Sequence, residues 1–309
     1  LDACDRLGMY VMDEAFDGWY TPKTYHDYSR IFESAWREDL SAMIQKDYNH
    51  PSVVLYSIGN EVTETACEQG VQTAEQMTAL AHALDNTRPV TAGINVLLNV
   101  YNQKGIGVYK ETESYKPEPL TPKKQEEKKK ESGSTFFNMV MQHLGPLMFY
   151  MSKGKKGDAA CRAVAEKLDI LGLNYAASRY EEDCLTYPNR IMVGSETIIG
   201  ELPYNWEQVK KHPEVIGDFA WAAIDYLGEA GIGQMIPQDT PGLPIAAGSG
   251  AIDLTGNITA EAYFQQTVWG LRKAPYLGVR PLIWSYKKMT GSAWRMTNAV
   301  ESWTWPGCE

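Results

Sequence analysis

Long apolar runs are missing from this sequence. No stretch reaches the roughly 18 apolar residues that a membrane-spanning helix requires, so we expect none. Basic residues are also scarce, because 29 lysines and arginines stand against 39 aspartates and glutamates and give a formal net charge of -10. Binding to phosphates or anionic lipids needs a basic surface, so this balance argues against a nucleic-acid or membrane partner. A neutral or cationic small molecule is the expected ligand.

Cysteine and histidine are sparse and follow no ligand spacing. The cysteines are odd in number and include no C-x-x-C pair, so we interpret most of them as free thiols; they lie at positions 4, 67, 161, 184 and 308. The five histidines are scattered, which argues against a metal-dependent deacetylase or amidohydrolase with clustered ligands. Asp13, Glu14 and His26 do not form a ligand motif either. We predict no required metal and no cofactor.

An initiator methionine is absent too. The chain opens on Leu1–Gly8, which has the pattern of the end of an amphipathic helix closed by a C-cap glycine. We expect an excised or processed part of a longer protein, with any signal peptide upstream, and we favour a cytoplasmic location. The 309 residues, 44% of them hydrophobic, favour one large α/β domain over two smaller ones.

Strand and helix patterns alternate along the chain. Apolar runs predict six strands, at residues 9–12, 53–58, 89–94, 170–174, 191–194 and 219–224. Amphipathic spacing predicts helices at 28–46, 74–84, 159–167 and 259–273; the first of these rests on Ile31, Ala35, Leu40 and Ile44. Such βα units form parallel strands joined by right-handed crossovers.

Six strands are too few for the common closed barrel of eight. If two βα units precede Leu1, the six strands become strands three to eight of a (β/α)8 TIM barrel. An open, doubly wound sheet needs no missing strands, but it would gather the functional residues at one switch point. Polar residues follow nearly every strand here. We therefore favour the barrel, lacking its first two βα units in this chain.

The segment 104–156 departs from this alternation. Its centre mixes prolines with a run of charges and has no core pattern, so we interpret it as an exposed insertion after Ile94, the fifth barrel strand. The alternative is a lid over the active site, because βα loops lie on the catalytic face of a barrel. Phe136–Tyr150 is apolar enough to pack against another part of the molecule.

Two glutamates follow buried apolar runs of the same build. Tyr56–Glu61 and Ile191–Glu196 each end in a carboxylate at the point where a strand should meet solvent. Two carboxylates from distant parts of a chain are the usual groups for hydrolysing a glycosidic bond. The alternatives are a helix-capping surface residue for Glu61 and an exposed turn residue for Glu196.

Six motifs follow one another along the chain: Asp13-Glu14, Asn49–Val53, Ser57–Glu61, Gly172–Tyr175, Gly194–Glu196 and Phe219–Trp221. In this order they resemble the catalytic barrel of glycoside hydrolase family 2, which contains β-galactosidases, β-glucuronidases and β-mannosidases. The resemblance implies a barrel over residues 1–301 and the entry to a further β-sandwich or a linker over 302–309. It also implies two preceding β-sandwich domains of the same polypeptide as partners and a small carbohydrate as substrate. A homo-oligomer stays open.

The resemblance implies a retaining double displacement. Glu61 would be the general acid and base, which requires a raised pKa. Glu196 would be the nucleophile that forms a covalent glycosyl-enzyme intermediate. Retention requires the two carboxyl groups to lie about 5–5.5 Å apart, whereas inversion requires about 6.5–9.5 Å. We expect Tyr175 to donate a hydrogen bond to Glu196 and keep it ionised, with simple packing as the alternative.

Sugar recognition needs polar groups that match hydroxyls and a flat apolar surface. We expect Asp13 and Glu14 to accept hydrogen bonds from the sugar, and the resemblance places Asn60 at the 2-hydroxyl. Asn174 and Tyr175 complete the polar set. Trp221 is the expected apolar platform, with a core position as the alternative. Four other tryptophans are candidates for outer subsites: Trp19, Trp206, Trp284 and Trp303.

One absence bears on the substrate. β-Glucuronidases of this family share an Asn-x-Lys pair that meets the sugar carboxylate, and the nearest segment, Gly256–Thr259, lacks the lysine. A neutral β-galactoside is therefore expected, with a β-glucuronide or β-mannoside as the alternative. The alternative from another class is a noncatalytic or inactive carbohydrate-binding fragment, because a barrel without two strands has unpaired sheet edges.

Overall fold

The computed structural model describes residues 1–105 and 152–305, apart from Tyr25, Ala230, Leu243, Ala293 and Trp303. The predicted insertion or lid therefore lies almost wholly outside the described residues, as do the final residues 306–309. Every described helix falls short of the length and apolarity that a bilayer crossing demands.

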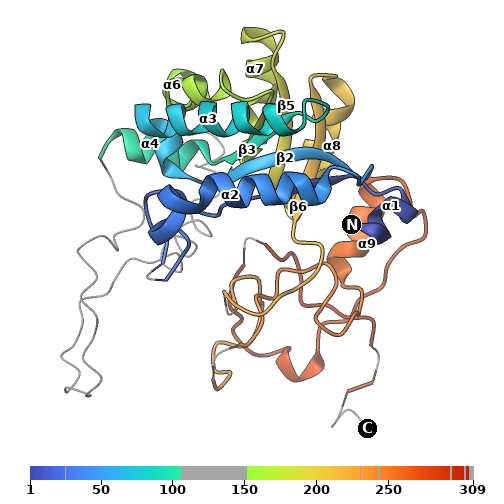
Figure 1. Cartoon of the computed structure of the whole chain (residues 1–309). Coiled ribbons are helices and arrows are strands. Elements are labelled where there is room, and N and C mark those ends of the chain that lie inside the picture. Colours follow the sequence, from blue (N-terminus) through green and yellow to red (C-terminus); the bar gives the residue numbers. More distant parts are fainter. Residues whose placement is uncertain are drawn as a thin grey trace, which may run out of the picture.

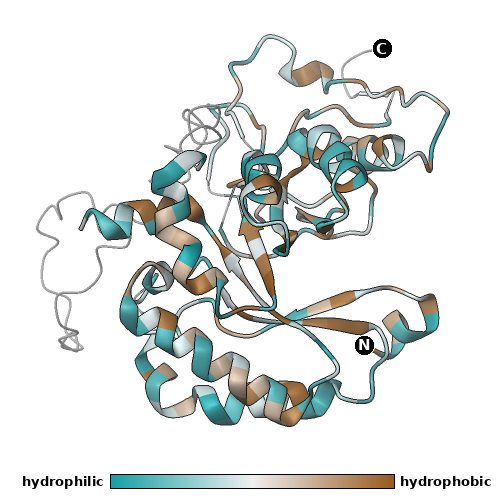
Figure 2. Ribbon diagram, turned by 90° about the horizontal axis from the view of Figure 1, so that it is seen from above, coloured by the Kyte–Doolittle hydropathy of each residue, from teal (hydrophilic) through white to brown (hydrophobic). Residues whose placement is uncertain are grey.

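A curled sheet of six parallel strands forms the centre of the fold. Its order, β1-β2-β3-β4-β5-β6, follows the chain, so each strand pairs with the next. Figure 2 shows strands of this sheet from above, with hydrophobic residues along them in brown. The strands are β1 (Val11–Glu14), β2 (Val53–Asn60), β3 (Val90–Ile94), β4 (Ile170–Asn174), β5 (Ile191–Ile198) and β6 (Val215–Trp221). A doubly wound sheet would reverse its order at a switch point, and this one does not. The fold is that of a TIM barrel, with six consecutive strands described.

Helices follow the strands and cover the outer side of the sheet (Figure 1). They are α1 (Asp2–Leu7), α2 (Ser29–Asp47), α3 (Glu68–Leu84), α4 (Val96–Gln103), α6 (Gly154–Ala165), α7 (Tyr180–Thr186), α8 (Leu202–Lys211) and α9 (Ala260–Val268). Short 3-10 turns occur at η1 (Thr63–Ala66), η2 (Ala177–Arg179), η3 (Ile199–Glu201) and η4 (Leu282–Trp284). The described chain after β6 is mostly irregular apart from α9 and η4.

Several predicted boundaries are wrong. The sixth strand begins at Val215 rather than at residue 219, and the last helix ends at Val268 rather than at 273. Strand β5 continues through Glu196 to Ile198, with shifts of register against both neighbours. Helices α4, α7 and α8 were not predicted because they are short, with 8, 7 and 10 residues. Short helices show too few turns for a periodic pattern.

The apolar face of α2 also differs from the predicted one. Ile31 is 53% exposed, whereas Phe32 and Trp36 are buried together with Leu40 and Ile44. These four residues recur every fourth position and so form one stripe against the sheet. Trp19 stacks on Phe32 and is fully buried, and its Nε1 donates to the carbonyl oxygen of Ile58 at 3.0 Å. The prediction of Trp19 as an outer subsite is therefore wrong.

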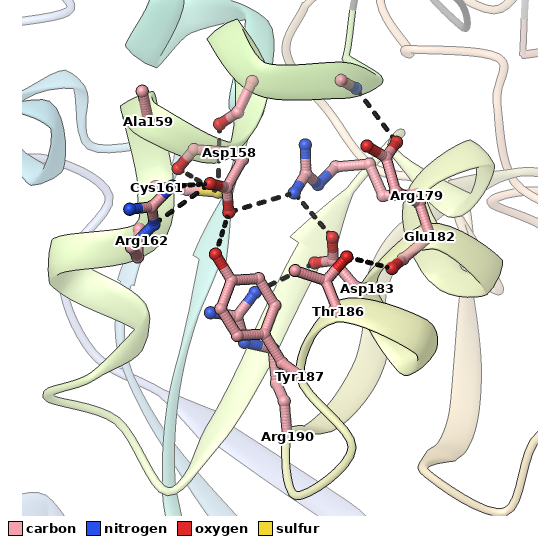
Figure 3. A network of polar contacts seen from close by, with 12 residues as sticks. Asp158, Ala159, Cys161, Arg162, Arg179, Glu182, Asp183, Thr186, Tyr187 and Arg190 are labelled. Atoms are coloured by element: carbon pink, nitrogen blue, oxygen red, sulfur yellow. Dashed lines mark hydrogen bonds and ion pairs between the residues drawn. The ribbon is translucent and has the colours of Figure 1, made fainter.

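A buried ionic network ties α7 to α6 and to the turn before β5 (Figure 3). Arg179 donates to Asp183 at 2.7 Å, and both side chains are only 1% exposed. Arg190 reaches the second oxygen of Asp183 at 3.1 Å, and Tyr187 donates to Asp158 at 2.7 Å. Buried charges are tolerated when they are paired in this way. The network fixes the position of α7 on the outside of the barrel.

Candidate active site

Asn174 lies between the two glutamates that the sequence singles out. Its Nδ2 is 3.4 Å from Oε1 of Glu61 and 3.4 Å from Oε2 of Glu196. The two oxygens are therefore no further apart than twice that distance, although their residues are separated by 135 positions in the chain. Asn174 is itself 2% exposed at the end of β4. The strand ends thus bring both carboxylates to one place.

The backbone at this place is unusual. Phe16, Glu61 and Tyr175 follow β1, β2 and β4, and each has a positive φ, of 75°, 48° and 54°. Residues other than glycine rarely adopt this region, and strain of this kind gathers at functional sites. Hydrogen bonds to neighbouring strands hold it: the N–H of Glu61 donates to the carbonyl of Gly93 at 2.8 Å, and that of Tyr175 to the carbonyl of Glu196 at 2.8 Å.

Glu61 receives a second amide from Asn95. The Asn95 Nδ2 donates to Glu61 Oε1 at 2.8 Å, while its Oδ1 accepts from the N–H groups of Leu97 and Leu98 as the N-cap of α4. Because the cap uses the Oδ1 of Asn95, the side-chain amide is held in the orientation that points Nδ2 toward Glu61. Burial raises the pKa of the Glu61 carboxyl, and the cation of Lys23 and these amides partly offset the effect. A proton is therefore held on this carboxyl more readily than in water.

Glu196 is held by an aromatic pair. The hydroxyl of Tyr175 donates to Glu196 Oε1, and Nε1 of Trp294 donates to that hydroxyl at 3.3 Å. Burial raises the pKa of Glu196, and the negative charge of Glu61 raises it further, whereas the hydrogen bond from Tyr175 lowers it. Two partly buried carboxyl groups this close resist double ionisation, so they titrate as a pair.

The amide of Asn174 is oriented by its own partners. Ser195 Oγ donates to Asn174 Oδ1 at 2.6 Å, and Asn174 Nδ2 donates to Asn60 Oδ1 at 2.9 Å. A Cβ on Gly93 would lie 2.9 Å from Asn174 Oδ1, so glycine is needed for this close approach. Asn60 and Asn174, which the sequence analysis names as site residues, therefore lie beside Glu61 and Glu196 in the structure.

Glu14 faces the same side of the sheet, and Asp13 does not. Ser57 Oγ donates to Glu14 at 2.6 Å, although Glu14 is exposed to solvent at the end of β1. The carboxylate of Asp13 instead pairs at 2.8 Å with Lys46 of α2, on the helix side. Successive residues of a strand point to opposite faces, so only one of the two can reach the strand-end cluster. The expected contact between Asp13 and a sugar is wrong on this geometry.

A cation close to the cluster has no counterpart in the predictions. Lys23 Nζ is 2.8 Å from Asp17 Oδ1 and 2.8 Å from the carbonyl oxygen of Asn60, and its side chain is 12% exposed. Its charge lowers the pKa values of Glu14, Glu61 and Glu196. The loop Ala15–Tyr28 carries no periodic signal, so the sequence alone offers no reason to single out this lysine.

The tryptophans fall into different environments. Trp221 packs edge-on against Trp294 with ring centroids 5.8 Å apart, which places it next to the Tyr175 contact. Trp284 belongs to η4 and lines a separate cavity of about 890 Å³, and Trp206 lies in α8. Trp303 lies outside the described residues. Trp294, Asn95 and Ser195 are close to the carboxylates and were missed, because single polar or aromatic residues carry no spacing signal.

Clusters with metal-ligand chemistry occur elsewhere. Among the described residues two groups bring three ligand atoms within 4.8 Å of one another, namely Cys184 with His212 and Glu214, and Asp2 with Asp5 and His50. Neither contains a residue of the strand-end cluster. The expectation that the reaction needs no metal stays a prediction.

Known proteins share this sequence over part or all of its length. Residues 1–135 match the family model described as the TIM barrel domain of glycosyl hydrolases family 2. A β-galactosidase from Bacteroides ovatus is 38% identical over 126 residues, which cover 31% of this chain and 15% of that protein. A protein of Formosa agariphila named as a candidate β-glucuronidase is 28% identical over 314 residues, 97% of this chain and 27% of that protein.

Solved structures match the whole chain. A glycosyl hydrolase family 2 member from Bacteroides cellulosilyticus has a TM-score of 0.67 and 30% identity, and the match covers 100% of this chain and 33% of that one. A second member from strain DSM 14838 has a TM-score of 0.64 and 29% identity. The chain thus spans about a third or less of the length of these relatives.

Proposed function

We propose, from the premise that this chain belongs to glycoside hydrolase family 2, that it carries the catalytic centre of a retaining β-glycoside hydrolase. One observation carries the proposal: Glu61 and Glu196 share the single donor Asn174 Nδ2 at 3.4 Å each. Carboxylates this close suit a mechanism in which one attacks the sugar and the other transfers the proton. The family membership supports the same chemistry.

In the first step, Glu196 attacks the anomeric carbon as a carboxylate while Glu61 donates its proton to the departing glycosidic oxygen. The raised pKa of Glu61 favours its protonated form, and the hydrogen bond from Tyr175 favours the ionised form of Glu196. Burial raises the pKa of Glu196 too, to about 8, and two carboxyl groups this close share one proton, which the resemblance to the family assigns to Glu61. A covalent glycosyl ester on Glu196 results.

In the second step, the Glu61 carboxylate accepts a proton from a water molecule as that water attacks the anomeric carbon. The bond to Glu196 breaks, and the product keeps the configuration of the substrate. We assign Asn60 and Glu14 to sugar hydroxyls beside the reacting carbon. We assign the flat apolar wall to Trp221 with Trp294, because these rings pack beside Tyr175.

A neutral β-galactoside is the substrate that we favour. Lys23, the cation described beside the cluster, forms an ion pair with Asp17 at 2.8 Å. Its positive charge is therefore neutralised within the protein and does not require an anionic sugar. The second candidate is a β-glucuronide, since displacing Asp17 would offer Lys23 to a sugar carboxylate. The relative from Formosa agariphila, which spans 97% of this chain, favours keeping that candidate.

A fluorosugar trap tests the mechanism. We expect 2-deoxy-2-fluoro-β-galactosyl fluoride to add one sugar mass to a longer protein that includes this chain, and peptide mapping to place it on Glu196. Glu196→Gln should take up none, and the exposed Glu207→Gln should label as the wild type does. Labelling elsewhere would overturn the assignment of the nucleophile, and a product of inverted configuration would overturn the mechanism.

The role of Glu61 as general acid is tested by comparing hydrolysis rates of substrates with poor and good leaving groups. Glu61→Ala should slow hydrolysis of aryl β-galactosides with poor leaving groups by about 10²–10⁴, the usual contribution of a general acid. Dinitrophenyl substrates should be affected less, and azide should restore turnover as a glycosyl azide of retained configuration. A panel of aryl β-galactosides, β-glucuronides and β-mannosides identifies the sugar.

Activity of the 309-residue chain alone is a separate question. Within the described sheet β1 and β6 form the edges, whereas a closed barrel surrounds its site on all sides. We propose that the chain by itself is inactive or weakly active and that β-sandwich domains of the same polypeptide complete the enzyme. Equal turnover by this chain and by a longer protein that includes it would contradict this.

A further inference from the structure

Three side chains of different chemistry meet at the end of the sheet opposite the proposed active site. Cys184 belongs to the last turn of α7, His212 follows α8, and Glu214 precedes β6. Their ligand atoms all lie within 4.8 Å of one another. Helix ends and strand starts share one end of a barrel, whereas Glu61 and Glu196 lie toward the other.

We propose that Cys184, His212 and Glu214 form a binding site for a zinc ion. Thiolate, imidazole and carboxylate are the three protein ligands of Zn²⁺, and bonds of about 2.0–2.3 Å in a tetrahedron place ligand atoms about 3.3–3.8 Å apart. The observed spacing needs side-chain adjustments of about 1 Å to reach this. A water molecule would complete the four ligands. The site is independent of the proposed glycosidase activity.

The imidazole of His212 gives an independent reason. Its Nε2 is buried and has no hydrogen-bond partner within the described structure. A buried polar nitrogen without a partner is destabilising, so such groups are rare in folded proteins. His212 offers one ring nitrogen to the cluster, and a metal ion bound by Nε2 would supply the missing partner.

The surrounding backbone holds the ligands in place. The N–H of Val215 donates to the carbonyl of His212 at 2.9 Å, and that of Met192 in β5 donates to the carbonyl of Glu214 at 2.8 Å. Lys211 pairs at 2.7 Å with Glu181, three residues before Cys184, and so links α8 to α7. The network around Asp183 anchors α7 at the residue before Cys184 (Figure 3).

The charges of the three ligands also suit a divalent cation, because a thiol gives up its proton when it binds Zn²⁺. Zn²⁺ would replace that proton, and the ion with a thiolate, a carboxylate and a neutral imidazole has no net charge. Binding therefore releases one proton and strengthens as the pH rises.

The test titrates the full 309-residue chain, freed of metal with chelator, with Zn²⁺ alone. We expect one ion per chain, release of about one proton and a higher melting temperature. Cys184→Ser and His212→Gln should each weaken binding at least tenfold. Co²⁺ in place of Zn²⁺ should give the sulfur-to-metal charge-transfer absorption that a thiolate ligand produces, and Cys184→Ser should abolish it.

Matched variants exclude other sites. Cys67→Ser removes an exposed thiol, Asp2→Asn removes a ligand of the acidic group at His50, and Glu196→Gln changes the active site. All three should bind zinc and give the cobalt absorption like the wild type. Loss of binding in any of them, unchanged binding in Cys184→Ser, or no binding at millimolar Zn²⁺ would overturn the proposal.

Discussion

Tyr175 contacts Glu196 twice: its hydroxyl donates to the carboxylate, and its backbone N–H donates to the carbonyl of Glu196 at 2.8 Å. The second contact fixes the distance between the two residues, so the first is built into the pairing of β4 with β5. A phenol placed in this way favours the ionised form of the carboxyl over the protonated form.

Removal of this hydroxyl should move the acidic limb of the pH–rate profile. In Tyr175→Phe the pKa of Glu196 loses a lowering influence and rises, and since the nucleophile must be ionised, the limb moves to higher pH. A hydrogen bond to a charged group contributes about 1.5–3 kcal/mol, which corresponds to about one to two pH units. The measurement is kcat/KM from pH 4 to 9. A lower rate with an unmoved limb would mean that Tyr175 only packs there.

Loss of the cation at Lys23 should move both limbs. Its charge lowers the pKa values of Glu61 and Glu196, so Lys23→Met should raise both and displace the whole profile toward higher pH. Lys23→Arg keeps the charge and should restore most of the wild-type profile. If only KM changed and both limbs stayed in place, Lys23 would act on the substrate rather than on the carboxyl groups.

The strand order and the two glutamates could be predicted because they rest on patterns that a sequence displays. Buried parallel strands are continuous apolar runs, and a carboxylate at the end of one is conspicuous. The partners of those glutamates could not be predicted, because Asn95 reaches Glu61 as the cap of an unpredicted helix and Trp294 reaches Tyr175 across 119 positions of chain. Contacts of that kind depend on packing between distant segments.

Failures within the predicted elements have physical causes as well. Asp13 was grouped with Glu14 because the two are adjacent, yet alternation along β1 sends Asp13 to Lys46. On α2, both Ile31 and Phe32 continue an apolar spacing, and only packing against Trp19 selects Phe32. A hydrophobic pattern predicts that a helix forms, but it does not decide which of two adjacent apolar residues faces the core.

Stability should depend on the protonation of Asp218. This residue of β6 accepts a hydrogen bond from Thr197 at 3.1 Å, but its Oδ1 is buried without a hydrogen-bond partner among the described residues, and burial raises the pKa to about 7 from 3.8. A carboxyl whose pKa is higher in the folded state is penalised as the pH rises from about 4 through about 7. Above that range the penalty is constant, at about 4 kcal/mol or less.

Asp218→Asn removes this penalty while keeping the shape. Urea unfolding should show the variant gaining stability relative to the wild type between pH 4.5 and pH 8, by about 2–4 kcal/mol. Glu207→Gln changes a carboxylate whose side chain is 73% exposed and should leave the pH dependence as it was. A constant difference between Asp218→Asn and the wild type at both pH values would contradict the burial argument.

Glycine at position 172 should be required by the packing of β4 against β3. A Cβ there would lie 2.4 Å from the carbonyl oxygen of Ala92 and 2.8 Å from Oγ1 of Thr91, and backbone atoms cannot move aside as a flexible side chain does. Gly172→Ala should therefore destabilise the fold by about 1–3 kcal/mol or more and, by moving Asn174, reduce turnover. Gly200→Ala is the matched control, since nothing lies within 4 Å of its added methyl group. Urea unfolding of the two variants should separate them clearly. Equal stabilities would mean that β3 and β4 can part without cost, and that the position of Asn174 between the glutamates does not depend on this contact.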